Sequence, residues 1–317
     1  MTDHPGRDHG GGIDAAAQRF GGVRADWLDL STGINPVPYP LPPLSADAWT
    51  ALPDHSAQSA LVDAARAFWQ VPDEMAILPV PGASAAIARL PALAPSGAVY
   101  IPAPTYNEHA AAFAANGWTI TQDPQGASAC VLVHPNNPDG RLWSAEACTG
   151  SLRVIDESFC DVMPNGSLLH LARNAPDTVI LKSFGKFWGL AGVRLGFVIG
   201  SASLIARLND LLGPWPVAGP ALEIGTAALR DTGWADATRV RLSADSARLD
   251  ALMQGAGAAV VGGTSLFRLY DVTDAVQWQA RLAQHHIWSR VFPYNARWLR
   301  LGLPGPAGWD RLEQALA

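Results

Sequence analysis

Apolar side chains recur along this chain with two different periods. Between Ala57 and Gln70 they fall at positions 57, 60, 61, 64, 65, 68 and 69, which is the spacing of one helical face. Short apolar runs at 75–79, 98–101, 130–133, 153–155 and 179–181 predict strands, with helices between several of them, including one at 108–116. Polar residues follow the later runs. Such alternation, with polar groups at successive strand ends, indicates an open α/β sheet with a ligand crevice.

The pattern changes after the Gly-Pro-Trp-Pro segment at 213–216. It predicts a long helix at 237–253, short strands at 258–261, 265–270, 287–292 and 298–303, and helices at 274–285 and 307–316. The first 45 residues predict an irregular arm with a short helix at 13–20 and a proline-rich stretch that is extended. We therefore expect a large domain at 46–221 and a smaller α+β unit made of 1–45 and 222–317.

Composition narrows the functional classes. Hydrophobic residues make up 49% and charged residues 16% of the 317 residues, which permits a sizeable core. The net charge of −6 and the lack of a basic run argue against nucleic-acid binding. No apolar stretch is long enough to cross a bilayer and the N-terminus lacks the apolar region of a signal peptide, so we expect a cytoplasmic protein without a membrane partner. The three cysteines show no metal or redox spacing, so no metal site is expected, and Cys130 and Cys160 are expected to be buried thiols.

Lysine is nearly absent from the chain. The only two, Lys182 and Lys186, lie in the stretch TVILKSFGKFWGLAGVRLGFVIG at 178–200, whereas arginine is plentiful. Arginine replaces lysine readily on a surface, but it stays protonated and cannot form a Schiff base. A lysine kept in a glycine-flanked loop therefore indicates an amine needed for covalent chemistry. Wholesale replacement of lysine by arginine in a GC-rich genome would explain the scarcity equally well.

The context of Lys186 favours the covalent interpretation. Ser183-Phe-Gly-Lys186, followed by Gly-Leu-Ala-Gly-Val-Arg194-Leu-Gly, resembles the cofactor-lysine segment of fold-type I enzymes that use pyridoxal 5′-phosphate (PLP). The resemblance implies an α/β fold with a mostly parallel central sheet in the large domain and a smaller α+β domain. It also implies that Lys186 forms the Schiff base with PLP, that Ser183 and Arg194 hold its phosphate, and that Lys182 is a strand-end residue. Arginine's planar fork suits a phosphate.

Further positions match the same pattern in order along the chain. Gly82, Ala83 and Ser84 open a helix and would offer N–H groups to the phosphate. In the family an aromatic residue stacks on the ring, an asparagine contacts its 3′-oxygen and an aspartate pairs with its nitrogen, and these roles fall to Tyr106, Asn137 and Asp156. Each residue also has an ordinary alternative as a helix cap, core or turn residue. Their shared order, ending at Lys186, favours a cofactor site in which Lys186, Asp156 and Tyr106 are catalytic.

The substrate residues are expected in the arm and the small domain. By resemblance, Arg300 pairs with the substrate α-carboxylate and Arg290 faces a substrate phosphate, with Asn137 and the arm residues His9, Gly33 and Asn35 beside them. Arg290 could equally be a surface residue. Phe159 stands where many aminotransferases carry a tyrosine that contacts the 3′-oxygen. Loss of that donor would raise the pKa of the lysine–cofactor imine, which casts doubt on an ordinary aminotransferase.

The resemblance covers the chain from about residue 30 onward and is closest to histidinol-phosphate aminotransferases and the L-threonine-O-3-phosphate decarboxylases of cobalamin biosynthesis. The His9-Gly-Gly segment, the loop at 31–36, the Asp-Glu-Ser-Phe box and the Trp-Leu-Arg-Leu-Gly-Leu-Pro ending favour the decarboxylase. It would act on a small phosphorylated amino acid, as a homodimer. A histidinol-phosphate-type aminotransferase is the alternative within the class. A non-catalytic scaffold of the same fold is the alternative outside it, and a dinucleotide-binding oxidoreductase fits poorly because no Gly-x-Gly-x-x-Gly follows an early strand.

Overall fold

The computed structural model describes residues 9–317 and divides the chain into two units. Unit 2 comprises 38–137 and 141–238, and unit 1 comprises the preceding residues, 138–140 and 239–317. These boundaries differ from the expected 46–221 for the large domain. The difference at the C-terminal side arises because α8 (Gly219–Arg230) packs against α3 (His55–Trp69) and so stays with the large sheet.

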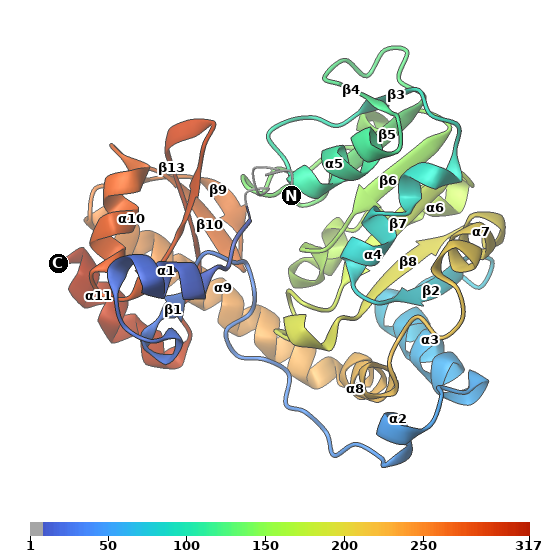
Figure 1. The fold of residues 1–317 in the computed structure, drawn as a ribbon, viewed down its shortest axis with the longest axis horizontal. Helices are drawn as coiled ribbons and strands as arrows, with labels where there is room; N and C mark the ends of the chain where they lie inside the picture. The colour runs from blue at the N-terminus through green and yellow to red at the C-terminus, as the bar shows by residue number, and fades with distance from the viewer. Residues whose placement is uncertain (1–8) are drawn as a thin grey trace. The chain divides into compact units, whose positions relative to one another are not determined.

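Unit 2 is built on a seven-stranded sheet in the order β2-β8-β7-β6-β5-β3-β4 (Figure 1). The strands are β2 (Ala76–Val80), β3 (Ala98–Tyr100), β4 (Thr119–Thr121), β5 (Ala129–Val133), β6 (Leu152–Asp156), β7 (Thr178–Ser183) and β8 (Gly196–Gly200). Only β8 pairs antiparallel with its neighbours, and the remaining pairs are parallel. The expected mostly parallel α/β sheet is therefore confirmed.

Alternate residues of the central strands face opposite sides of this sheet, as the strand period requires. Val154, Val179 and Leu181 belong to a core cluster on one side, which is completed by α4 (Ala83–Ile87), α5 (Asn107–Ala115) and α7 (Ala202–Leu212). On the other side, Cys130 and Leu132 pack with Trp143 and Cys148. The two short helices α2 (Asp47–Thr50) and α6 (Leu169–Asn174) complete unit 2. Because both faces are covered, the strands read as continuous apolar runs.

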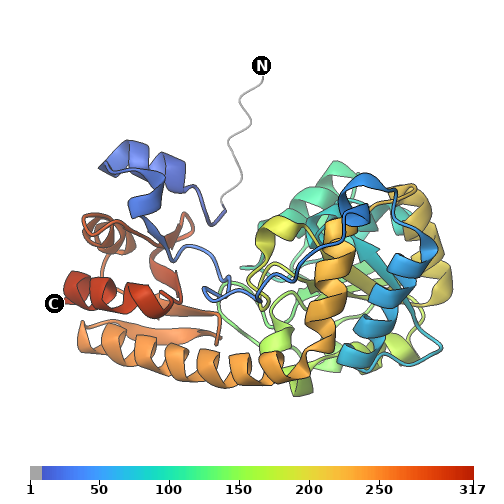
Figure 2. The ribbon, with the colours of Figure 1, turned by 90° about the horizontal axis from the view of Figure 1, so that it is seen from below.

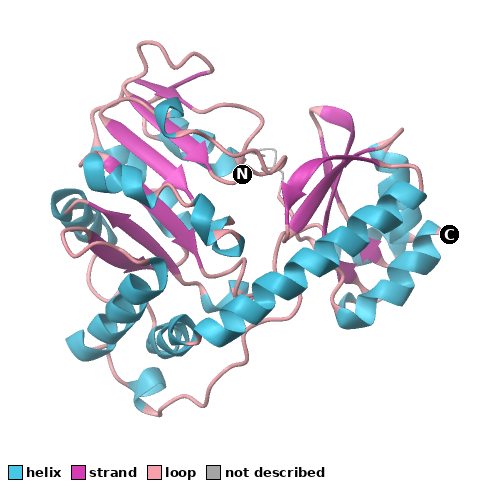
Figure 3. Ribbon diagram, turned by 180° about the vertical axis from the view of Figure 1, so that it is seen from behind, coloured by secondary structure: helices cyan, strands magenta, loops and turns pink. Residues whose placement is uncertain are grey.

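Unit 1 contains a four-stranded antiparallel sheet in the order β12-β13-β10-β9 (Figure 3). Its strands are β9 (Ala259–Thr264), β10 (Phe267–Asp271), β12 (Arg290–Phe292) and β13 (Asn295–Gly302), and α10 (Ala275–Ala283) packs on β13 and on α11 (Trp309–Leu316). The long helix α9 (Thr232–Gly255) begins in unit 2 and ends in unit 1.

The N-terminal arm is part of unit 1. Its strand β1 (Leu28–Asp29) pairs in parallel with β11 (Ile287–Trp288). Helix α1 (Ile13–Phe20) is drawn in blue in Figure 2. Its residues Ile13 and Ala16 pack against Trp27 and Ala283. An arm that runs as a strand beside the C-terminal half has its backbone groups paired and is held in place. The α+β character expected for this part of the chain is confirmed.

The cysteines differ from expectation in one respect. Cys130 forms a disulfide with Cys148, a residue 18 positions later, so the expectation that Cys130 is a free thiol is wrong, whereas Cys160 is a buried free thiol. The strand holding Cys130 passes close to the turn that holds Cys148, a proximity that sequence spacing does not encode. Within residues 9–317, no helix is long and apolar enough to cross a membrane, and no His, Cys, Asp and Glu side chains cluster as a metal site would require.

Candidate active site

Three neighbouring parallel strands of unit 2 bring the polar segments of the sequence to one edge of the sheet. In the register, Val133 of β5 lies opposite Asp156 of β6, and Asp156 lies opposite Leu181 of β7. The chain then continues to Asn137 after β5, and to Lys186 after β7. Because parallel strands end at the same edge, residues far apart in sequence meet there.

One cavity collects nearly all the residues that the sequence predicts for the cofactor. It spans about 630 Å³ when its open mouth is included. Eight of the nine predicted residues line it: Ala83, Ser84, Tyr106, Asn137, Asp156, Ser183, Lys186 and Arg194. The ninth, Gly82, lies against Arg194, because a Cβ built on it would fall 2.5 Å from Arg194 Nη2.

One end of the cavity gathers hydrogen-bond donors. Arg194, in the left-handed region with φ 55°, donates from Nη1 to Ala191 O at 2.9 Å, and its guanidinium lies beside Gly82. Ser84 and Ser183 line the same cavity. Gly82 has φ 79° and ψ 150°, a conformation that a side chain would strain. A guanidinium and hydroxyl groups around a glycine without a side chain form a set suited to a phosphate.

Asp156 is buried and held by donors from two directions. His109 Nε2 lies 2.8 Å from its Oδ2, while Ser158 donates both its backbone N–H, at 3.0 Å, and its hydroxyl to Oδ1. Burial alone would raise the pKa of Asp156, but the hydrogen bonds from His109 and Ser158 outweigh burial and lower the pKa below its ordinary value. The carboxylate therefore remains charged inside the protein.

His109 is a residue that sequence reasoning missed. It is fully buried in α5, and its Nδ1 has no hydrogen-bond partner among the described residues. A neutral ring that carries its proton on Nε2 would donate to Asp156 and leave only an acceptor at Nδ1 unpaired. The sequence does contain one indication of its role. His109 lies three residues after Tyr106, and a helix places residues with this spacing on the same face. The two rings are indeed in contact, with centroids 6.1 Å apart.

Tyr106 and Lys186 present an aromatic ring and an amine to the cavity. Burial, together with the Asp156 and Glu108 carboxylates, raises the pKa of Tyr106 to about 12, so its phenol stays neutral. Lys186 Nζ lies 5.3 Å from the centroid of Phe159, which is buried and lines the same cavity. The position at which many aminotransferases carry a tyrosine hydroxyl therefore holds an apolar ring beside the lysine amine.

The loop that carries Lys186 rests on stacked aromatic rings. Trp188 is parallel to Phe184 on one side, with centroids 5.0 Å apart, and to Trp234 on the other, with centroids 5.2 Å apart. Tyr39 packs edge-on against both tryptophans. Such rigid rings bury a large area and restrict the backbone between Phe184 and Trp188, which includes Lys186.

The predicted substrate residues other than Asn137 lie in unit 1. Arg290 of β12 and Arg300 of β13 are direct cross-strand partners, so their side chains leave the sheet on the same face. Arg290 donates to His9 O, and Arg300 Nη2 donates to Ser31 O at 2.6 Å. Asn35 and Gly33 are buried in the loop after β1, and Asn35 Oδ1 accepts from Arg241 Nη2 at 2.6 Å. The structure thus brings three of the predicted residues, His9, Arg290 and Arg300, together in unit 1.

Known proteins resemble the chain over nearly its whole length. The family model described as aminotransferase class I and II matches residues 118–310. A threonine-phosphate decarboxylase from Sinorhizobium sp is 42% identical over 98% of this chain and 97% of its own, and one from Pseudomonas aeruginosa is 40% identical over the same shares. Among solved structures, a histidinol-phosphate aminotransferase from Clostridium acetobutylicum superposes with a TM-score of 0.78 at 18% identity, covering 91% of this chain and 98% of its own, which shows a shared fold.

Proposed function

Since the chain belongs to the class I and II aminotransferase family of PLP-dependent enzymes, and within it to the threonine-phosphate decarboxylases, we propose that it decarboxylates L-threonine O-3-phosphate. The products would be (R)-1-amino-2-propanol phosphate and CO2, and the amino alcohol phosphate would serve cobalamin biosynthesis. The reaction removes a carboxylate from a substrate that also carries a phosphate. The protein must therefore bind two anionic groups besides its cofactor.

The observation that carries the proposal is the cross-strand pair of Arg290 and Arg300. Two like charges directly opposite each other in a sheet are unfavourable unless anions accompany them. Arg300 lies within β13, is buried and donates to the Ser31 carbonyl, whereas Arg290 is more exposed and donates to the His9 carbonyl. We assign the α-carboxylate to Arg300 and the phosphate to Arg290, assisted by the arm residues His9, Gly33 and Asn35.

The residues of the unit 2 cavity fit PLP. Ser84, Ser183, Arg194 and the space beside Gly82 suit its phosphate, Tyr106 offers a flat ring, Asn137 offers an amide for the ring oxygen, and Asp156 offers a carboxylate that His109 keeps charged. PLP would supply an electron sink for the bond that breaks at the substrate Cα. Asp156 sustains that role because a retained carboxylate keeps a ring nitrogen protonated.

Substrate orientation would decide which bond breaks. Arg300 and Arg290 would hold the two ends of the substrate, and fixing both ends selects cleavage of the bond to the carboxylate over cleavage of the bond to hydrogen. Lys186 would hold PLP through its amine, and the same amine would return a proton to Cα after CO2 has left. Phe159, which gives Lys186 an apolar neighbour in place of a hydroxyl, distinguishes this site from the aminotransferase pattern.

The test is CO2 release from L-threonine O-3-phosphate by purified protein with PLP and without a keto acid. We expect one equivalent of aminopropanol phosphate for each CO2. Lys186→Ala should lower kcat by about 10³-fold or more, since both the covalent step and the proton transfer depend on this amine. If no CO2 were released and histidinol phosphate were transaminated once 2-oxoglutarate was added, the protein would be a histidinol-phosphate aminotransferase and the proposal would be wrong.

A wild-type rate in Lys186→Ala would exclude the assigned role of this lysine. A protein that binds PLP but leaves both substrates unchanged would favour the scaffold alternative. The homodimer and the cytoplasmic location stay predictions, and light scattering of the purified protein would test the first of them.

A further inference from the structure

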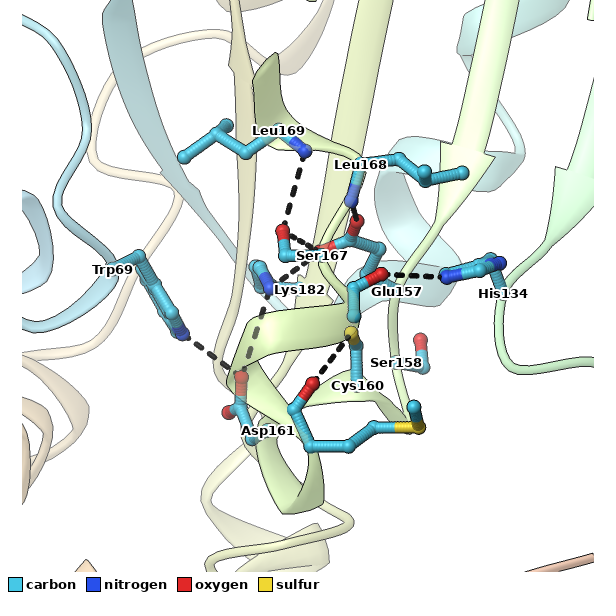
Figure 4. A network of polar contacts seen from close by, with 12 residues as sticks. Trp69, His134, Glu157, Ser158, Cys160, Asp161, Ser167, Leu168, Leu169 and Lys182 are labelled. Atoms are coloured by element: carbon cyan, nitrogen blue, oxygen red, sulfur yellow. Dashed lines mark hydrogen bonds and ion pairs between the residues drawn. The ribbon is translucent and has the colours of Figure 1, made fainter. Parts of the chain in front are cut away.

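A buried ion pair that the proposed mechanism does not use links the segment after β6 to β7 (Figure 4). Lys182 Nζ lies 2.6 Å from Glu157 Oε2 and 3.8 Å from Asp161 Oδ1, and all three side chains are at most 4% exposed. Glu157 also accepts from Ser167 Oγ at 2.8 Å and from the Leu168 N–H at 2.5 Å. Burial by itself would lower the pKa of Lys182, but the Glu157 and Asp161 carboxylates raise it, so the ammonium stays charged.

Each member of this pair is the sequence neighbour of a cavity residue. Asp156, the last residue of β6, and Ser183, the last residue of β7, line the cavity. Glu157 follows Asp156 and Lys182 precedes Ser183, and neither of them lines the cavity. Successive side chains of a strand point to opposite faces of the sheet, so the pair lies on the face away from the cavity. It joins the ends of β6 and β7 there, where the Glu157 N–H also donates to Leu181 O at 3.0 Å.

Stability alone is a weak reason for such a pair. Two charges taken out of water cost free energy that their attraction does not fully return, and well-packed apolar residues often serve a core as well or better. The lysine is also one of only two in the chain. What charges provide and apolar side chains do not is a directional link with a fixed length between two strand ends.

We infer that Glu157 and Lys182 are positioning residues, which fix the spacing between Asp156 and Ser183 and thereby the orientation in which the protein binds PLP. The inference rests on the proposed cofactor. Asp156 would contact one end of the cofactor and Ser183 the other, so a change in the spacing of β6 and β7 at this edge would weaken both contacts together. Asp161, which accepts from Trp69 Nε1 at 2.9 Å, holds the lysine from the other side.

The experiment uses the double substitution Glu157→Gln and Lys182→Met, which removes both charges at nearly constant volume. Asp161 keeps its Trp69 donor in this variant but loses the nearby charge of Lys182, so the thermal unfolding temperature of the PLP-free protein should fall. The dissociation constant for PLP should rise by about tenfold, by analogy with metal sites, where removing the groups that orient the ligands lowers metal affinity by 10–100-fold. Amides at 155–158 and 180–184 should exchange hydrogen faster in the PLP-free protein.

Two further variants separate positioning from general stability. Lys182→Arg keeps the charge and can reach both carboxylates, so it should restore most of the PLP affinity. Arg268→Met breaks the partly buried Arg268–Asp250 ion pair of unit 1, whose Nη2–Oδ2 distance is 2.8 Å. This control should lower the unfolding temperature and leave the dissociation constant for PLP unchanged.

A double variant that binds PLP with wild-type affinity and shows wild-type exchange would overturn the inference. So would a loss of PLP affinity in Arg268→Met as large as that in the double variant, because affinity would then follow global stability. If the wild-type protein itself failed to bind PLP, the proposed function would fall with the inference. Normal binding by wild type with an unaffected double variant would remove the inference alone.

Discussion

At the scale of single residues, the contact between His109 and Asp156 makes a prediction about pH. The pKa of Asp156 is lowered in the folded protein, so this carboxylate stabilises the fold above its unfolded pKa, and the contribution is lost as pH falls through the folded pKa. His109→Phe keeps a buried ring but removes a donor that lowers the pKa of Asp156, so this pKa should rise. The acid limb of the kcat/KM profile should then move to higher pH by a similar amount.

The measurement is the pH dependence of kcat/KM for CO2 release in wild type and His109→Phe. Ser158→Ala, which removes the hydroxyl donor to Asp156 and keeps the backbone donor, should shift the acid limb in the same direction. An unchanged acid limb in both variants would mean that another group sets it.

Phe159 permits a second prediction at this scale. Its ring lies 5.3 Å from Lys186 Nζ and lines the cavity, so Phe159→Tyr would add a hydroxyl there. A donor to the anionic ring oxygen of PLP stabilises the form that has lost the imine proton. The pKa of the lysine–cofactor imine should therefore fall by about one unit, as seen by titrating the visible absorbance of the PLP-bound protein. Phe20→Tyr, which alters a partly exposed ring of unit 1, should leave that titration unchanged.

At the scale of elements, the turn between β2 and α4 depends on Gly82. Its φ of 79° and ψ of 150° are accessible essentially to glycine alone, and a Cβ there would lie 2.5 Å from Arg194 Nη2. Gly82→Ala should destabilise the protein by about 1–3 kcal/mol from backbone strain and should also displace Arg194. Urea unfolding should show the first effect and PLP titration the second.

Gly255→Ala provides the matched control for this turn. Gly255 ends α9, and a Cβ on it would meet nothing within 4 Å. Alanine is the better helix former, so this change should leave stability equal or slightly higher and PLP binding unaltered. Equal effects of the two substitutions would show that the Gly82 turn tolerates a side chain.

The spacing of apolar residues predicts helices and strands that bury one face. It does not predict features that depend on contacts between distant parts of the chain. The helix expected from 57–70 is α3 (His55–Trp69), and the strands ending at Asp156 and near Lys186 are present. The prolines at 214 and 216 favour a domain end just before helix α8, but α8 begins beyond them and tolerates Pro220 in its first turn. The Cys130–Cys148 disulfide and the His109 contact depend on distances across the fold that no local pattern contains.

The same distinction explains what the sequence revealed of the site. The lysine segment and the polar strand ends are local patterns, so the family and the fold were predicted and are confirmed. The roles of Tyr106, Asn137 and the arginines stay predictions. The structure shows where their side chains lie, whereas their roles require kinetic and binding measurements on variants. The groups behind the cavity, His109 and the Glu157–Lys182 pair, required the structure because their partners come from other elements.

At the scale of the whole molecule, all nine predicted cofactor residues belong to unit 2, and the predicted substrate residues other than Asn137 belong to unit 1. This separation predicts that cofactor and substrate binding can be altered independently. Arg300→Met should remove a charge-assisted contact worth about 1.5–3 kcal/mol, which is about a 10–150-fold loss in kcat/KM. The dissociation constant for PLP should not change.

Arg290→Met separates the two anionic ends of the substrate. If Arg290 binds the phosphate, its loss should raise KM for L-threonine O-3-phosphate by about 10–150-fold, and any slow reaction of phosphate-free L-threonine should be unaffected. Arg300→Met should impair both substrates, because both carry the α-carboxylate. Steady-state kinetics of the two variants on the two substrates, beside PLP titrations, make the comparison. Equal losses on both substrates in Arg290→Met would contradict its assignment to the phosphate, and weakened PLP binding in either variant would contradict the division of roles between the units.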